Sequence, residues 1–107
     1  MAYDANLDAR IQDVVLSWGA TRKMMFGGTG YMLNGNLLAG VHGDRLIVRL
    51  GAADGEAALE EPGVAPFDMT RRPMAGWVTV GQDQLGGSGL LEWLTRARTF
   101  VASLPSK

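Results

Sequence analysis

Apolar residues at helical spacing open the chain. After Asp4 they recur every three or four positions, which places them along one side of a helix. The members of this stripe are Leu7, Ile11, Val14, Val15 and Trp18. Asp4 is a residue type that caps helix N-termini, and Gly19 is one that ends helices. The pattern therefore predicts a first helix between Asp4 and Gly19.

The hydrophobic pattern changes after Met24 to short apolar runs separated by turn residues. The runs are residues 26–33, 36–42 and 45–50. Asn34-Gly35 separates the first two and favours a two-residue type I′ hairpin, because both residues tolerate positive φ. Gly43-Asp44 suits a second tight turn, with the glycine at its first position. We expect three antiparallel strands in a meander.

The second half of the chain predicts helix, two strands and a final helix. Residues 52–61 are rich in alanine and stop at Pro62-Gly63, which indicates a short helix. Residues 66–69 and 76–80 indicate strands around a turn. The final helix is expected to open near Ser88 and to end at Pro105. Its apolar residues are Leu90, Leu91, Trp93, Leu94, Ala97, Phe100, Val101 and Leu104.

The expected order of elements is α-β(3)-α-β(2)-α. Helices grouped apart from an antiparallel sheet favour an α+β fold of two layers, a two-layer α/β sandwich in which helices cover one face of a mainly antiparallel sheet. A length of 107 residues is that of a single domain. We therefore assign residues 1–107 to one domain.

Side-chain alternation predicts what the other sheet face displays. Successive side chains of a strand point to opposite faces. If Leu46, Val48 and Leu50 face the helices, and Val78 and Val80 do so too, a second set faces away. That set is Arg45, Ile47, Arg49, Trp77 and Thr79. We expect this half apolar, half basic face to be open and to bind a partner.

Composition narrows the classes of function. A net charge of −1 argues against an overall electrostatic grip on nucleic acid. Cysteine is absent, which excludes disulfides, thiolate chemistry and zinc sites built on cysteine. No apolar run reaches the roughly 20 residues of a membrane span. The acidic, polar start does not resemble a signal peptide, so a cytoplasmic location without membrane association is expected.

Charge is nevertheless distributed in blocks. Residues 21–50 carry a net charge of +3, and residues 51–70 hold five carboxylates without a lysine or arginine. Residues 71–107 return to +3. The two basic blocks would share a surface if the fold brought them together.

The glycines at 27, 28 and 30 raise the question of a phosphate loop. Such a loop needs glycines where a strand meets a helix N-terminus, and its Walker form needs Lys followed by Ser or Thr. Here Tyr31 and a hairpin follow. We therefore interpret these glycines as a strand with a bulge or a close backbone approach.

No set of residues predicts catalysis. His42 is the single histidine, lies before a tight turn and lacks the spacing of a metal or triad motif. The carboxylates Glu56, Glu60 and Glu61 are interpreted as a solvated helix face. The methionines are interpreted mostly as core residues, with one or two lining an interface. We predict no catalytic residue, cofactor or metal site.

Arg71-Arg72-Pro73 is the most suggestive polar element. Two arginines before a proline turn, near Trp77, suit an acidic partner or phosphate. The alternative is a solvated loop in which Arg72 pairs with Asp68.

Once these segments are placed, the chain resembles the N-terminal domain of the TfoX/Sxy family of competence regulators. The resemblance rests on residues 22–51, 62–80 and 90–105, where "MFGG", the hairpins that follow it and the "RPM-x-GW" pattern at 72–77 are specific in combination. It implies the α-β(3)-α-β(2)-α fold and a role in transcription activation without catalysis. The family's regulators also carry a second, helical domain, which these 107 residues do not include. We expect a stand-alone N-terminal domain.

Three hypotheses of function remain open. The first is a non-catalytic module that binds a protein partner or itself as a homodimer, through Arg45, Ile47, Arg49, Arg71, Arg72 and Trp77. The second is direct nucleic-acid binding by the two basic blocks. The third is a ligand sensor or enzyme with His42, Asp44 and Arg45 around a pocket.

Overall fold

The computed structural model describes residues 4–25, 28–67 and 75–106 of the chain. Its first helix, α1 (Ala5–Val15), begins where the sequence predicts: the Asp4 carboxylate accepts a 3.0 Å hydrogen bond from the Leu7 N–H. A short 3₁₀ turn, η1 (Leu16–Trp18), continues it and ends at Gly19, whose φ is +89°. The predicted cap and stop are both confirmed.

Six antiparallel strands form one sheet in the order β1-β2-β3-β4-β6-β5. Their bounds are Thr21–Met25, Gly28–Leu33, Asn36–His42, Arg45–Arg49, Val64–Pro66 and Trp77–Val80, for β1 to β6 in turn. The α+β class is therefore confirmed. Four strands precede the middle helix, however, where three were expected.

The additional strand is β1, and sequence reasoning missed it for a physical reason. Thr21 to Met24 are all exposed, so the segment has no buried alternate positions to produce an apolar period. The strand is held by backbone pairing with β2, for example Lys23 opposite Gly30. It forms one edge of the sheet.

Both predicted hairpins are present. Asn34 and Gly35 have φ values of +55° and +81°, as a type I′ turn requires, and they join β2 to β3. Gly43 has a φ of +62° and begins the turn between β3 and β4, where His42 pairs with Arg45.

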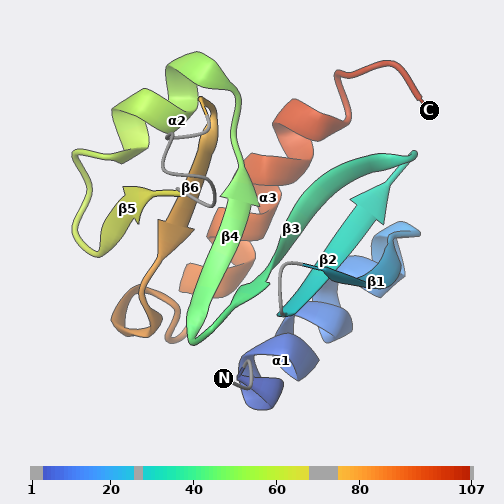
Figure 1. Ribbon diagram of the computed structural model, residues 1–107, viewed down its shortest axis with the longest axis horizontal. Helices are drawn as coiled ribbons and strands as arrows, with labels where there is room; N and C mark the ends of the chain where they lie inside the picture. Colours follow the sequence, from blue (N-terminus) through green and yellow to red (C-terminus); the bar gives the residue numbers. More distant parts are fainter. Residues whose placement is uncertain (1–3, 26–27, 68–74, 107) are drawn as a thin grey trace.

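The helical layer lies on one side of the sheet. Figure 1 shows α1 and α3 (Gly89–Val101) behind the strands, with α2 (Ala52–Ala58) at one end of the sheet. The core between the layers contains the predicted strand residues Leu46, Val48, Leu50, Val78 and Val80. The helices contribute Leu7, Ile11, Val15, Ala58, Leu90, Trp93, Leu94, Ala97 and Val101 to it.

Two predicted boundaries need correction. The strand expected at 66–69 is found at Val64–Pro66, and residues 68 and 69 lie outside the described part of the chain. The final helix begins after Ser88 as predicted but ends at Val101, before Pro105. Its last apolar residue, Leu104, follows in a turn, where the N–H of Leu104 bonds to the carbonyl of Val101. The helical spacing of apolar residues in the sequence therefore extends past the end of the helix.

Candidate functional site

The face of the sheet that points away from α1 and α3, here called the outer face, carries the predicted polar set. Strand pairing aligns Arg45 with His42, Ile47 with Thr79, and Arg49 with Trp77 across neighbouring strands. Residues directly opposite each other in an antiparallel pair share a face. The core members of these strands alternate with them, so the predicted orientation of Arg45, Arg49 and Trp77 is confirmed.

The centre of the outer face is closed, which the sequence did not predict. Ile47 is only 2% exposed and Thr79 only 6%. The ring of Phe67 lies 6.0 Å from the His42 ring and 6.3 Å from the Trp77 ring, so it crosses the middle of β4 at the level of Ile47. Ile47 is therefore almost fully buried within the domain, contrary to the open face that was expected, and its role in partner binding stays a prediction.

Arg45 contributes to this closure. Its Nε donates to the Thr79 hydroxyl at 2.9 Å, and its Nη2 donates to the Gly63 carbonyl at 2.8 Å. The guanidinium thus ties β4 to β6 and to the residue that precedes β5. Its hydrogen-bonding capacity is largely used within the domain, although the side chain remains partly exposed.

Arg49 differs from Arg45 because its guanidinium contacts rings rather than oxygens. It lies 5.2 Å from the centre of the Trp77 ring and 5.8 Å from that of Phe100 on α3. Both distances are within the roughly 6 Å range of cation–π attraction. Within residues 4–25, 28–67 and 75–106, no oxygen accepts a hydrogen bond from it. Arg49 and Trp77 are each half-buried, so part of the pair reaches solvent.

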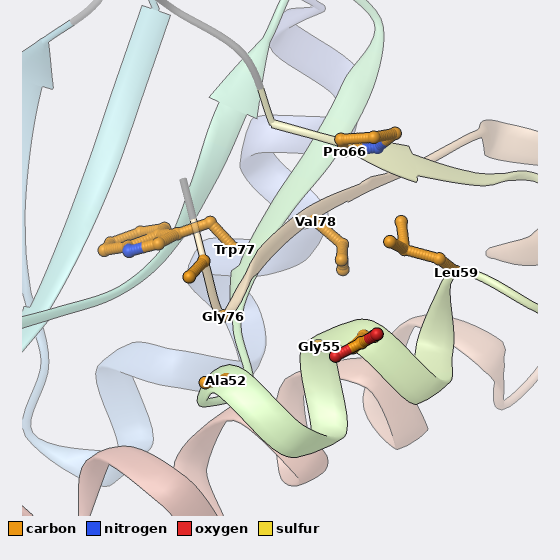
Figure 2. Close-up of a pocket in the computed structure, with 9 residues that line it drawn as sticks. Ala52, Gly55, Leu59, Pro66, Gly76, Trp77 and Val78 are labelled. Carbon is orange, nitrogen blue, oxygen red and sulfur yellow. The ribbon is translucent and has the colours of Figure 1, made fainter. Parts of the chain in front are cut away.

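A pocket of about 180 Å³ lies between α2, β5 and β6. Its strand residues Pro66 and Val78 are paired with each other and share the face opposite the Trp77 side chain (Figure 2). Its lining is mainly apolar: Ala52, Gly55, Glu56, Leu59, Pro66, Ala75, Gly76, Trp77 and Val78. Figure 2 shows Leu59 and Val78 side by side above α2, while the Trp77 side chain extends in the opposite direction from Val78. Close packing at Gly55 shapes one wall, since a Cβ there would come within 2.8 Å of the Gly76 Cα.

The group suggested by His42, Asp44 and Arg45 is not assembled. His42 is exposed and stands edge-on to Phe67, while the Arg45 guanidinium is bound to Thr79 and Gly63. Asp44 contributes its backbone carbonyl, which accepts a 3.0 Å hydrogen bond from Gln82. The pocket described above lies elsewhere, beside α2.

The glycine-rich segment is a strand. Gly28 and Gly30 belong to β2, which is paired on both sides, by β1 and by β3. A register shift follows at Tyr31/Met32, as a bulge would produce. Gly40 on β3 allows close approach, because a Cβ there would lie 2.2 Å from the Thr29 carbonyl oxygen. The interpretation as a strand is confirmed for Gly28 and Gly30, and the irregularity follows them at Tyr31/Met32; Gly27 lies outside the described residues.

The structure describes some of the remaining candidate residues and not others. Glu61 forms a salt bridge of 2.8 Å with Arg96 on α3, and Glu56 lines the pocket. Met24, one of the methionines interpreted mostly as core residues, is 62% exposed on the edge strand. Arg71 and Arg72, as well as Met69 and Met74, lie outside the described residues, and their proposed roles stay predictions.

A buried polar network escaped sequence reasoning. Asp8 on α1 is only 3% exposed. Its carboxylate accepts hydrogen bonds from the Tyr31 hydroxyl at 2.5 Å and the Thr29 hydroxyl at 2.8 Å. Its second oxygen accepts from Arg22 at 2.8 Å and from Gln12 at 3.2 Å. One carboxylate thereby joins α1 to β1 and β2.

The network shifts the ionisation of its members. Burial by itself would raise the pKa of Asp8, but the hydrogen bonds from Tyr31, Arg22 and Thr29 outweigh it and hold that pKa below its ordinary value. Burial and the Asp8 charge raise the pKa of Tyr31. One signal for this site was in the sequence: Asp8 lies at helical spacing from Ile11 and Val15, inside the apolar stripe.

Two further features of the described part of the chain bear on membranes and metals. None of its helices combines the length and apolarity that a bilayer crossing demands. Its histidine, aspartate and glutamate side chains do not gather in threes or more where a metal ion would fit.

These features define an α+β domain with a six-stranded antiparallel sheet, helices on one face and an arginine–tryptophan pair on the other. The family model for the TfoX N-terminal domain matches residues 18–100, and the chain belongs to that family. Membership suggests a regulatory type of domain. No curated protein and no solved structure shows significant similarity to the chain. The family match begins after α1, so the helix that carries Asp8 lies outside it.

Proposed function

We propose that this protein is a non-catalytic regulatory module that binds a protein partner, or a second copy of itself, on the outer face around Arg49 and Trp77. The proposal rests on the half-buried Arg49–Trp77 pair on the outer face. Tryptophan and arginine are enriched among the residues that dominate binding energy at protein interfaces. Family membership supports a regulatory rather than a metabolic role.

Because the centre of the outer face is closed, fewer of its residues can contact a partner. Ile47 is almost fully buried, and Arg45 is tied to Thr79 and Gly63. Arg49 and Trp77 therefore become the principal contacts. Arg71 and Arg72 are close to Trp77 in sequence and stay in the proposal as flanking basic residues.

Nucleic-acid binding receives less support from the arginines. Among the arginines that the structure describes, four donate hydrogen bonds inside the domain: Arg10 to the Leu85 carbonyl, Arg22 to Asp8, Arg45 to Thr79, and Arg96 to Glu61. Binding a phosphate backbone requires several cations that can replace its counterions. We therefore rank a protein partner first.

Site-specific photocrosslinking tests the proposal. A p-benzoylphenylalanine is placed at position 77 or, as a control, at position 18. Trp18 is a matched control because it is also half-buried and also lies beneath an arginine, Arg98 at 4.7 Å, but on the helical side. Irradiation in cell extract and of the purified protein separates a foreign partner from a second copy.

Discrete adducts from position 77 that are absent from position 18 are the expected result. An adduct of twice the domain's mass with purified protein identifies self-association. Identical adducts from both positions, or none from position 77 in either sample, would contradict the proposal.

A further inference from the structure

We propose that the pocket between α2 and the paired strands β5 and β6 is a second binding site, separate from the outer face. It takes one lysine or arginine side chain from a basic segment of another protein. The apolar stem of that side chain fills the pocket, and its charged end meets the Glu56 carboxylate. The inference goes beyond the proposed function, because the pocket residues Pro66 and Val78 face away from the Trp77 side chain (Figure 2).

The size of the pocket limits what it can hold. Its volume is about 180 Å³, whereas sites for small molecules typically measure roughly 300–1,000 Å³. A space of this size suits one side chain of a partner rather than a whole ligand. Leu59, which lines the pocket, is 40% exposed, so the apolar lining can be reached from solvent.

The walls of the pocket are formed by the domain itself and are held in place. One wall is α2, and the other is the strand pair in which Pro66 lies opposite Val78. The two walls meet in a backbone contact, since a Cβ on Gly55 would come within 2.8 Å of the Gly76 Cα. The Gly76 carbonyl also accepts a 2.7 Å hydrogen bond from the Leu50 N–H. A pocket that is formed in advance loses little conformational freedom on binding, which favours affinity.

The chemistry of the lining selects a basic side chain. Among the described residues that line the pocket, Glu56 alone is charged. Its carboxylate has no hydrogen bond or salt bridge in the described part of the chain, whereas Glu61 is paired with Arg96. A purely apolar occupant would take water away from the Glu56 carboxylate without replacing the lost hydrogen bonds. A lysine or arginine side chain matches both features, because it carries a charged end on an apolar stem.

The charge around the pocket favours the same occupant. Residues 51–67 contain four carboxylates and neither lysine nor arginine. An acidic surface attracts basic segments and repels acidic ones, including the backbone of a nucleic acid. A second copy of this chain, and the chain's own Arg71 and Arg72, are competing sources of a basic side chain, and the experiment tests for both.

Peptide selection with matched variants tests the site. Ligands are selected from a random peptide library displayed on phage, and their affinities for the domain are measured by fluorescence anisotropy. Glu56→Gln is compared with Glu60→Gln, which removes the same charge from a residue outside the pocket lining. Leu59→Ala is compared with Leu91→Ala, since Leu91 is similarly exposed, at 49%, but lies on α3. Thermal unfolding establishes that each variant is folded.

We expect the selected peptides to share a lysine or an arginine. Replacing that lysine by norleucine, or that arginine by citrulline, removes the charge and should weaken binding about threefold to fivefold. Glu56→Gln should cause the same loss, and the uncharged peptide should lose little further affinity on that background. Leu59→Ala should weaken binding about threefold, whereas Glu60→Gln and Leu91→Ala should each change it less than about twofold.

Peptides without a shared basic residue, binding that is insensitive to Glu56→Gln or Leu59→Ala, or an empty selection would overturn the inference. An equal loss from Glu60→Gln would do so too, because the attraction would then be a general effect of charge. Tighter peptide binding when Arg71 and Arg72 are both replaced by Gln would identify the chain's own arginines as the occupant. Self-association that Glu56→Gln abolishes, measured by light scattering, would identify a second copy instead.

The two proposals can fail separately. Photocrosslinking from position 77 probes the outer face, whereas the Glu56 and Leu59 variants probe the opposite side of β6. Adducts from position 77 together with a failed peptide selection would refute only this inference and leave the proposed function standing.

Discussion

The Arg49 guanidinium lies 5.2 Å from the centre of the Trp77 ring, across the pairing of β4 with β6 and on the side of the sheet that α1 and α3 leave uncovered. The same guanidinium contacts Phe100 from the final helix. Three segments that are far apart in sequence thus meet at one cation. The pair is a packing contact that also reaches solvent on the outer face.

Replacing Arg49 by Gln should cost little stability. Cation–π contacts at partly exposed sites contribute roughly 0.5–1 kcal/mol, and this guanidinium has no hydrogen bond in the described region to lose. We expect the free energy of unfolding, measured in urea, to fall by about 1 kcal/mol or less. A much larger loss would mean that Arg49 is chiefly a structural residue, which would weaken the proposed function.

Replacing Asp8 by Asn should destabilise the domain much more. The substitution removes the charge that Tyr31, Thr29 and Arg22 surround and leaves an amide to face their donors. Arg22 is partly exposed, which limits the penalty. We expect a loss of about 2–3 kcal/mol in urea unfolding. Asp13→Asn on the exposed side of the same helix should stay within about 0.5 kcal/mol of wild type.

Acid should reduce the stability that Asp8 contributes. Because the folded-state pKa of Asp8 lies below its unfolded value of about 3.9, that contribution is present above this pH and is lost as pH falls through the folded pKa. The difference in unfolding free energy between wild type and Asp8→Asn should therefore narrow on acidification from pH 6 to about pH 3. A constant difference over this range would contradict the assigned network.

Tyr31 should give stability a pH dependence of the opposite sign. Its pKa is raised in the folded protein, so folding favours the protonated phenol. The associated stability is present below the unfolded pKa of about 10 and is lost as pH rises toward the folded pKa. Wild type should lose stability above about pH 10 more steeply than Tyr31→Phe. Thermal unfolding midpoints across this range provide the comparison, and parallel curves for the two proteins would refute it.

Gly55→Ala tests the packing of α2 that shapes the pocket. Alanine gains roughly 1 kcal/mol in helix propensity, but its Cβ would come within 2.8 Å of the Gly76 backbone. We expect the clash to prevail and to give a net destabilisation of about 1–3 kcal/mol. Gly86→Ala is the control, since a Cβ there has no neighbour within 4 Å. A stabilised Gly55→Ala variant would show that α2 can move away from β6.

Local sequence patterns predicted most of the secondary structure. The stripe from Leu7 to Trp18 predicted the first helix, and Asn34-Gly35 predicted a turn whose φ values are both positive. Alternation along residues 45–50 predicted which side chains point away from the helices. The resemblance to the TfoX N-terminal domain was also found from the sequence and is confirmed.

The candidate site was predicted only in part. Arg49 and Trp77 were both on the expected face, because strand alternation depends on the backbone alone. Their contact with each other and with Phe100 depends on register and on the position of α3, neither of which a local pattern contains. The pocket beside α2 likewise arises where Gly55 approaches Gly76.

The sequence by itself determined the helix stripes, the two hairpin turns and the two faces of each strand, because these depend on neighbours a few residues apart. The tertiary structure alone decided which side chains of the outer face and which polar groups are buried. Ile47 is covered because Phe67 crosses β4, and Asp8 is charged in the interior because Arg22, Thr29 and Tyr31 converge on it. Such environments are built by segments that are distant in the chain. Their packing and hydrogen bonds form only when those segments come together, so a local sequence pattern does not contain them.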